Sequence, residues 1–310
     1  MRIGYVVLSH RDWPQVARLA RVLRRLDPSA EIVVSHDVSD PEGAAHLRAV
    51  DELILLTHRG GRADFSAIER WRAAVDALAA VGDVDFVVLL SGQDQLAVHP
   101  DRIKADLAAS GDGRMEHFDV FDPTACPWRA GEGRSRYRFR WRTLSSLGSR
   151  SARVLRFLHV INRVQPLVRV NVAYGALRVG LPGSGLPSDY RVTGGSQWHA
   201  LSWRAVQSVC AQMDARPELM TWGSQSLVSD EAFIQTLVSH DAALQVCQGA
   251  MRYFDFSATT SGHPRTLGLD DLDAIVGSGA WFARKVDWSS SRRLIDEFER
   301  RLGVSSDAVQ

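Results

Sequence analysis

Lysine is almost absent from this chain of 310 residues. Lys104 and Lys285 are the only two lysines, and the other 35 of the 37 basic residues are arginine. A chain that favours arginine so strongly does not use lysine as casual surface filler. We therefore treat a surviving lysine as a candidate for a specific role, although Lys104 is also compatible with simple tolerance.

A charge excess of one sign is missing as well. The formal net charge is +1 at pH 7. Proteins that bind nucleic acid along its length need a basic excess to displace counterions. The composition therefore argues against a nucleic-acid partner and leaves a small substrate or a locally charged pocket.

Cysteine pairs and long hydrophobic runs are also lacking. Cys126, Cys210 and Cys247 are far apart and form no C-x-x-C pair, so neither a disulfide framework nor a zinc site is indicated, and we expect a reducing cytoplasm. The first apolar run, Ile3 to Leu8, is too short for a signal peptide or a membrane span. We interpret it as a strand and expect no integral membrane segment.

Several catalytic motifs are absent. The sequence contains no G-x-x-x-x-G-K-[ST] phosphate loop and no G-x-S-x-G elbow, and Gly183-Ser184-Gly185 is more typical of a turn than of a dinucleotide site. Metal-dependent sugar transferases commonly place D-x-D after an apolar strand. Here Asp83-Val84-Asp85 precedes the strand, and Gln93-Asp94-Gln95 after it offers one carboxylate. No metal cofactor is expected.

Apolar runs that alternate with helical stripes predict an α/β fold. Four runs are typical of buried strands, namely Ile3 to Leu8, Ile32 to Ser35, Leu53 to Leu56 and Phe86 to Leu90. Between them, Val16 to Leu26 and Ile68 to Leu78 carry apolar stripes at helical spacing. A βαβ order favours a mainly parallel, Rossmann-like sheet flanked by helices.

Polar residues follow the predicted strands. In parallel sheets, ligands bind beyond the carboxyl ends of the strands. His10 follows the first strand, Asp37 the second, and Asp94 the fourth. For Asp37 and Asp94, contact with a nucleotide ribose or base competes with a role as a turn or helix cap.

Two arginine-rich stretches lie in the looser middle of the chain. Alternate arginines from Arg134 to Arg142 predict a strand with arginines on one face, either solvated or in contact with an anionic ligand. Arg150 to Val164 predicts a basic amphipathic helix with Val154, Leu155, Leu158 and Ile161 on one side. We favour a packed surface helix, and contact with a membrane surface or a lipid-linked acceptor is the alternative.

Six blocks of sequence resemble one family when taken together and in order. They are LLSGQD (89–94), GGSQWHALSWRAV (194–206), SDEAFIQTL (229–237), RYFDF (252–256), GHPRTL (262–267) and WFARKVD (281–287). The chain resembles the core-2/I-branching N-acetylglucosaminyltransferases, glycosyltransferase family 14, which include the peptide xylosyltransferases. Without the membrane anchor and the many cysteines of animal members, it looks like a bacterial cytoplasmic relative.

This resemblance implies a GT-A type fold and a metal-independent transfer with inversion, most simply of N-acetylglucosamine from a UDP-sugar to an acceptor hydroxyl. It implies that Glu231 is the catalytic base and that Arg265 and Lys285 hold the diphosphate. From spacing alone, Asp230 and Glu231 are more typical of acidic residues that cap a helix, and the family resemblance reverses this preference for Glu231. Arg265 and Lys285 alone would be ordinary surface charges.

The acceptor side is less defined. Glu116 is the candidate counterpart of an acceptor-binding glutamate, and Trp198 and Phe256 are candidates for stacking on a sugar, although a core position is favoured for Trp198. The acceptor is a saccharide, a small molecule, a peptide or a lipid-linked intermediate. We expect a single catalytic unit over 1–310, with a nucleotide-binding half (1–120) and an acceptor and catalytic half (121–310).

Two other functions fit the same residues. One is a sugar- or nucleotide-binding protein that keeps the fold without catalysis. The other is a metal-dependent transferase in which Asp94 binds the ion. Donor hydrolysis separates the first from the transferase, and activity in a chelator separates the second.

Overall fold

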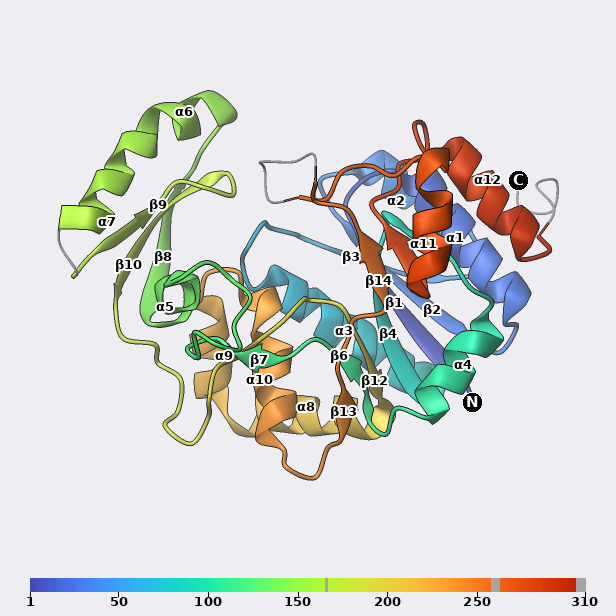
Figure 1. The fold of residues 1–310 in the computed structure, drawn as a ribbon, viewed down its shortest axis with the longest axis horizontal. Helices are drawn as coiled ribbons and strands as arrows, with labels where there is room; N and C mark the ends of the chain where they lie inside the picture. Colours follow the sequence, from blue (N-terminus) through green and yellow to red (C-terminus); the bar gives the residue numbers. More distant parts are fainter. Residues whose placement is uncertain (165–166, 258–262, 305–310) are drawn as a thin grey trace.

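The computed structural model describes residues 1–164, 167–257 and 263–304, and Figure 1 shows their arrangement. Gly262, the first residue of the GHPRTL block, lies outside these ranges. A seven-stranded sheet forms the centre, with the strand order β13-β6-β12-β4-β1-β2-β3. Its strands are β1 (Ile3–Ser9), β2 (Glu31–Asp37), β3 (Ile54–His58), β4 (Phe86–Ser91), β6 (Gly113–Met115), β12 (His199–Ser202) and β13 (Val246–Cys247).

The pairing confirms the predicted α/β class with a mainly parallel sheet. Strands β4, β1, β2 and β3 are all parallel, and β12 is antiparallel to both β4 and β6. The four predicted strands match β1 to β4. The residues of β1, β2 and β4 are buried on both sides, which is the pattern that a sheet covered on two faces requires, whereas β3 at the edge is only partly buried.

Helices cover both faces of this sheet. Val6, Val33 and Leu89 face a core shared with α3, α8, α9 and α10, whereas Tyr5, Val7 and Val34 face a core shared with α1, α2 and α4. The bounds are α1 (Trp13–Leu26), α2 (Pro41–Arg48), α3 (Ser66–Val81), α4 (Pro100–Ala108), α8 (Trp203–Ala215), α9 (Pro217–Ser224) and α10 (Phe233–His240).

The C-terminal region returns to the first half of the chain. A small sheet of β14 (Arg252–Phe254), β15 (Phe282–Arg284) and β5 (Asp94–Leu96) packs beside the main one, with α11 (Leu272–Ser278) and α12 (Arg292–Arg301) outside it. Short 3₁₀ turns precede two helices, namely η2 (Ser229–Glu231) before α10 and η3 (Leu269–Asp271) before α11. Each of these two helices is therefore preceded by a short turn of tighter helical geometry.

The predicted strand from Arg134 to Arg142 is wrong in its first half. Residues Glu132–Tyr137 form helix α5, and the strand β8 begins only at Phe139 and ends at Ser146. Gly131, with φ of 79°, turns the chain into α5, and Arg136 pairs with Glu132 one turn away. Arg140 and Arg142 remain exposed on β8, while Phe139 and Trp141 are buried.

A lobe projects from the body of the molecule at the upper left of Figure 1. It contains β8, β9 (Arg169–Asn171) and β10 (Ala176–Pro182) as an antiparallel sheet. The predicted helix from Arg150 to Val164 consists of α6 (Ser149–Val154), a 3₁₀ segment η1 (Leu155–Val160) and α7 (Ile161–Val164). Two short strands, β7 (Phe118–Asp119) and β11 (Thr193–Gly194), pair near the base of the lobe.

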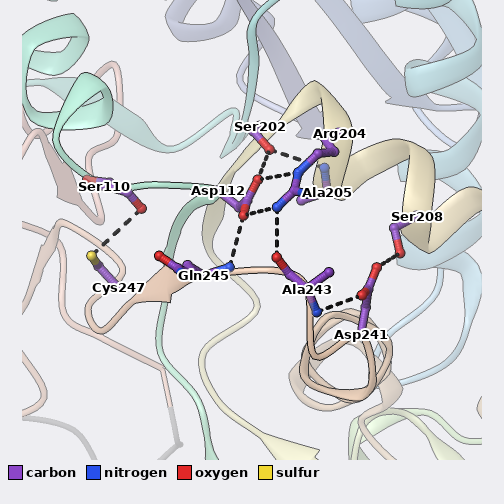
Figure 2. A network of polar contacts seen from close by, with 10 residues as sticks. All are labelled: Ser110, Asp112, Ser202, Arg204, Ala205, Ser208, Asp241, Ala243, Gln245 and Cys247. Atoms are coloured by element: carbon purple, nitrogen blue, oxygen red, sulfur yellow. Dashed lines mark hydrogen bonds and ion pairs between the residues drawn. The ribbon is translucent and has the colours of Figure 1, made fainter.

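A polar network joins three elements at the β13 edge of the main sheet (Figure 2). Asp112 accepts hydrogen bonds from Arg204 Nε (3.0 Å), Arg204 Nη2 (2.6 Å), Ser202 Oγ (3.1 Å) and the Gln245 backbone N–H (2.9 Å). Arg204 and these other donors outweigh burial and hold the pKa of Asp112 below its ordinary value. One carboxylate thus joins the start of β6, the start of α8 and the start of β13.

Replacing Asp112 with Asn is expected to lower the free energy of unfolding by about 1–3 kcal/mol at pH 7, because a charge-assisted pairing is lost. The native pKa lies below the unfolded value of about 3.9, so this contribution is present above pH 4 and disappears as the pH falls through the native pKa. The difference in the free energy of unfolding between wild type and variant, from urea titrations at pH 7 and pH 3, measures this contribution. Asp101→Asn, at a side chain that is 80% exposed, is the control. Equal destabilisation by both variants would contradict this account.

Candidate active site

Positive side chains gather where β1, β3 and β15 end. Lys285 follows β15, Arg11 follows β1, and Arg62 lies in the loop after β3. Burial lowers the pKa of the half-buried Lys285, and the charges of Arg11, Arg284 and Arg62 lower it further. Among the described residues no carboxylate lies within ion-pair distance of Lys285, and only Asp287 opposes the shift. We call Arg11, Arg62, Arg284 and Lys285 the cation cluster.

Two histidines border the cation cluster. Burial and Arg11 lower the pKa of His10, and burial, Arg62 and Lys285 lower the pKa of His263. His263 Nε2 also lies in hydrogen-bond contact with Arg62. Both rings are consequently neutral at pH 7 and add no positive charge of their own.

Asp37 lies at the end of β2 and is buried. Its carboxylate accepts hydrogen bonds from the backbone N–H groups of Ser39 (2.8 Å) and Gly60 (2.8 Å). Burial would raise its pKa, but these N–H groups and Arg70 outweigh burial and hold the pKa below its ordinary value. Asp37 therefore ties the loop after β3 to the end of β2, and its contact with a nucleotide stays a prediction.

Asp94 lies beneath the cation cluster. It is fully buried, accepts a hydrogen bond from the Ser91 N–H (2.7 Å), and pairs with Arg252 (3.6 Å) and Arg284 (3.8 Å). The guanidinium carbons of both arginines lie 4.7–4.9 Å from the ring of the buried Trp198. The Asp94 carboxylate and the Trp198 ring thus both contact the Arg284 guanidinium and hold it in place. A direct contact of either residue with a nucleotide or a sugar stays a prediction.

Arg265 is placed differently from Lys285. Its guanidinium donates to Asp255 Oδ2 (2.6 Å) and Asp271 Oδ2 (3.0 Å), so two carboxylates balance its charge. The backbone connects it to the cation cluster, because the Leu267 N–H donates to the Lys285 carbonyl (2.8 Å). As placed here, Arg265 joins Asp255 to Asp271, and its role at a diphosphate stays a prediction.

Glu231 lies in η2, where an arginine orients it. Arg136 Nη1 donates to Glu231 Oε2 (2.6 Å), and the Glu231 side chain is 35% exposed. Burial raises the pKa of Glu231, and Arg136 opposes the rise. No described residue hydrogen-bonds Oε1, so one carboxylate oxygen is held and the other is available to a ligand. This is the arrangement that a general base requires.

The backbone before Glu231 is strained. Val228 has φ of 56°, a region in which a β-branched residue is rarely found. Asp230 Oδ1 is buried without a hydrogen-bond partner among the described residues, and burial, together with the charge of Glu231, raises the pKa of Asp230. Hydrogen bonds from Val228 N–H to Ala63 O (3.3 Å) and from Tyr137 Oη to Val228 O (3.0 Å) hold the segment in place.

The loop 59–65 brings the two charged groups together. Its Arg62 belongs to the cation cluster, and its Ala63 carbonyl holds Val228, three residues before Glu231. The charge of Asp64, in the same loop, contributes to the raised pKa of Asp230. This seven-residue loop therefore contacts the segment that carries Glu231 and also contributes Arg62 to the cation cluster.

The structure gives different surroundings to the two remaining acceptor candidates, Glu116 and Phe256. Glu116 Oε2 accepts a hydrogen bond from the Ser196 N–H (2.9 Å), and the Glu116 charge contributes to the raised pKa of Glu231. Phe256 is 52% exposed and lies against Phe254, with ring centroids 6.0 Å apart. Acceptor binding by Glu116 and Phe256 stays a prediction.

A cavity of about 790 Å³ opens near Arg136. Trp128 lines it, and the Arg136 guanidinium lies 4.5 Å from the Trp128 ring centroid. Arg129, Arg134 and Arg138 also line this cavity. It has the size of a site for a small molecule and shares the Trp128 wall with the arginine that holds Glu231.

Sequence reasoning missed most of the arginines at this site. Arg136 was assigned to a strand, and Arg11 and Arg62 belong to no block that we singled out. Arg284 was within reach, since it directly precedes Lys285 in the WFARKVD block. The contacts that reveal the others join residues far apart in the sequence, such as Arg136 and Glu231.

The described residues contain neither a cluster of metal ligands nor a membrane-spanning helix. Within 1–164, 167–257 and 263–304, no three His, Cys, Asp or Glu side chains converge as metal ligands would. In these same ranges, no helix has the length and apolar character that crossing a membrane requires.

Known proteins resemble the chain at two levels. The sequence pattern of the family described as Core-2/I-Branching enzyme matches residues 65–276. No curated protein matches the chain in sequence. Similar solved structures include a 4-diphosphocytidyl-2C-methyl-D-erythritol synthase from Anaerococcus prevotii, with 11% identity over 89% of this chain and 95% of that chain and a TM-score of 0.38.

Two further solved structures resemble this chain to a similar degree. An active-site mutant of LgtC has 11% identity over 98% of this chain and 95% of that one, with a TM-score of 0.37. A nucleoside-diphosphate-sugar pyrophosphorylase from Vibrio cholerae has 9% identity over 79% of this chain and 90% of that one, with a TM-score of 0.35. These TM-scores are all below 0.5, and no functional conclusion rests on them.

Replacing Asp230 with Asn is expected to stabilise the protein at neutral pH. The raised pKa means that the native state binds a proton more tightly than the unfolded chain does, so stability falls as pH rises from about 4 through the native pKa. The variant removes this loss, so its free energy of unfolding should exceed that of wild type by roughly 1–2 kcal/mol at pH 8 and by almost nothing at pH 4. Thermal unfolding at both pH values checks this. A variant less stable than wild type at pH 8 would show that the carboxylate is favourably placed.

Proposed function

The chain belongs to the Core-2/I-Branching enzyme family, and hence to the glycosyltransferases, and from this premise we propose that it transfers a sugar from UDP with inversion and without a metal ion. Glu231 acts as the base, and the cation cluster receives the departing UDP. The single observation that carries the proposal is the unpaired Lys285 among Arg11, Arg62 and Arg284, together with loop 59–65, which contacts the segment that carries Glu231.

Of the four cations in the cluster, only Arg284 lies within ion-pair distance of a carboxylate among the described residues, and the remaining positive charge favours an anionic ligand. Burial and then repulsion by the neighbouring arginines lower the pKa of Lys285, and a bound diphosphate relieves that repulsion. Guanidinium groups suit phosphate oxygens because their planar donors bind two at once, and an ammonium adds a point charge. Together these cations supply the stabilisation that a divalent ion gives in other transferases.

Glu231 has the features that deprotonation of an acceptor hydroxyl requires. Its Oε2 is occupied by Arg136, so Oε1 takes the proton while the acceptor oxygen forms a bond to the anomeric carbon. The bond from that carbon to the UDP oxygen breaks on the opposite face, and its electron pair leaves with UDP towards the cation cluster. The raised pKa of Glu231 improves its match to a hydroxyl proton.

The donor sugar and the acceptor are proposed more broadly. By the family resemblance, N-acetylglucosamine is the sugar that we propose for the donor. Glu116 and Phe256 are proposed to contact the acceptor, because Glu116 lies within electrostatic range of Glu231 and Phe256 offers an exposed ring.

Changing Glu231 to Gln is expected to lower kcat by about 10²–10⁴, because the general base is lost. The Kd for UDP should stay within about twofold, since UDP binds at the cation cluster. In the wild type, the rate should fall as the pH drops through the raised pKa of Glu231. Turnover is measured with UDP-N-acetylglucosamine and UDP binding by calorimetry. Glu218→Gln, at an exposed surface glutamate, is the control. A Glu231 variant with normal turnover would refute the assignment.

Changing Lys285 to Met is expected to raise the Kd for UDP at least about tenfold, equivalent to about 1.4 kcal/mol. The other lysine of the chain, Lys104 on α4, provides a matched control, because its charge is already paired with the carboxylate of Asp27 (2.8 Å). Lys104→Met should leave UDP binding unchanged. Calorimetric titration of both variants with UDP measures the two Kd values. Equal affinity in Lys285→Met and wild type would remove Lys285 from the donor site.

A further inference from the structure

The lobe between Phe139 and Pro182 has an unusual charge composition. From Gly133 to Ser188 the sequence contains eleven arginines and no Asp, Glu or Lys, whereas the whole chain has a net charge of +1. The remaining residues therefore carry a net charge of −10 (+1 minus +11). The positive charge of this protein is concentrated on the lobe and on the residues at its base.

The same lobe exposes apolar side chains. Seven of the thirteen large apolar side chains that are exposed among the described residues lie between Leu144 and Leu181. Val154, Phe157, Val160 and Val164 are 56–73% exposed, and their spacing of three or four residues puts them on one side of the α6-η1-α7 segment. Leu155, Leu158 and Ile161 are only half-buried beneath them.

These exposures correct the packed surface helix that we favoured from sequence. That prediction placed Val154 on the packed side, but Val154 is 69% exposed. A helical segment with apolar residues in solvent and flanking arginines, such as the exposed Arg150 and Arg153, is typical of a segment that lies in a membrane interface.

We propose that the lobe binds to the surface of an anionic lipid bilayer, with the α6-η1-α7 segment inserted at the level of the headgroups. Phe157 and Val160 enter the apolar boundary, and Arg150 and Arg153 contact the anionic headgroups. Each cationic side chain near such a surface adds about 1 kcal/mol of attraction, which corresponds to about a fivefold change in partitioning.

Charge favours a lipid surface over a second copy of the chain. A symmetric dimer through this face would bring two acid-free, arginine-rich surfaces together, and like charges would oppose it. Exposed aliphatic and aromatic side chains beside the arginines also favour lipid over nucleic acid, because a phosphate backbone offers them no apolar partner.

The lobe is attached to the candidate active site. Arg178 Nη2, on β10, donates to the Arg62 carbonyl in loop 59–65 (2.9 Å), and β8 follows directly on α5, which carries Arg136. A lobe lying on a bilayer would therefore hold the site near that surface. The binding itself does not depend on the proposed transfer, and it can be tested separately.

Vesicle co-sedimentation of the full chain tests the proposal. We expect binding to phosphatidylcholine vesicles that contain 30% phosphatidylglycerol, weak binding to phosphatidylcholine alone, and loss of binding in 0.5 M NaCl. Arg150→Gln with Arg153→Gln should lower the partition coefficient about tenfold or more. Phe157→Ser with Val160→Ser should lower it by a similar factor without altering the salt dependence. Arg25→Gln with Arg48→Gln, the same charge change on α1 and α2, should have no effect.

Controls separate this proposal from its competitors and from the proposed function. The circular dichroism spectrum and thermal unfolding midpoint of all three double variants should equal those of wild type, which shows that they are folded. Absence of binding to the anionic vesicles overturns the proposal whether or not the protein transfers sugar. Binding to duplex DNA instead of vesicles also overturns it, as does a dimer in analytical ultracentrifugation that Phe157→Ser with Val160→Ser dissociates.

Discussion

Parallel strands all end at the same edge of their sheet, and this constraint shapes the rest of the molecule. Because β1, β2 and β3 run side by side, Arg11, Asp37 and loop 59–65 meet at one edge. The C-terminal region then returns through β15 to add Arg284 and Lys285 there. A site assembled from residues far apart in the chain thus rests on backbone pairings that a side-chain substitution leaves largely intact.

The candidate site carries local features that oppose folding. Val228 is in a left-handed conformation, Asp230 is buried with an unpaired oxygen, and four cations share one edge. Sites of this kind persist because the surrounding structure holds them, and here Arg136, Tyr137 and loop 59–65 do so. A ligand that is negatively charged would relieve part of this cost.

The sequence predicted the sheet better than the site. Buried strands leave continuous apolar runs, so β1 to β4 were found within two residues at each end. The helix α5 was missed because its alternating arginines imitate a strand, whereas the pair of Arg136 with Glu132 one turn away and the contact of Arg136 with Glu231 favour the helix. Lys285 was found through its rarity and its family block. Arg62 was not, since its position depends on tertiary contacts alone.

The central claim is that side-chain cations hold the diphosphate. The most direct measurement is a calorimetric titration of the wild-type protein with UDP, carried out once in excess EDTA and once in millimolar Mn²⁺. The account predicts the same Kd in both buffers and a weaker Kd as ionic strength rises. UDP binding that appears only with the divalent ion would contradict it.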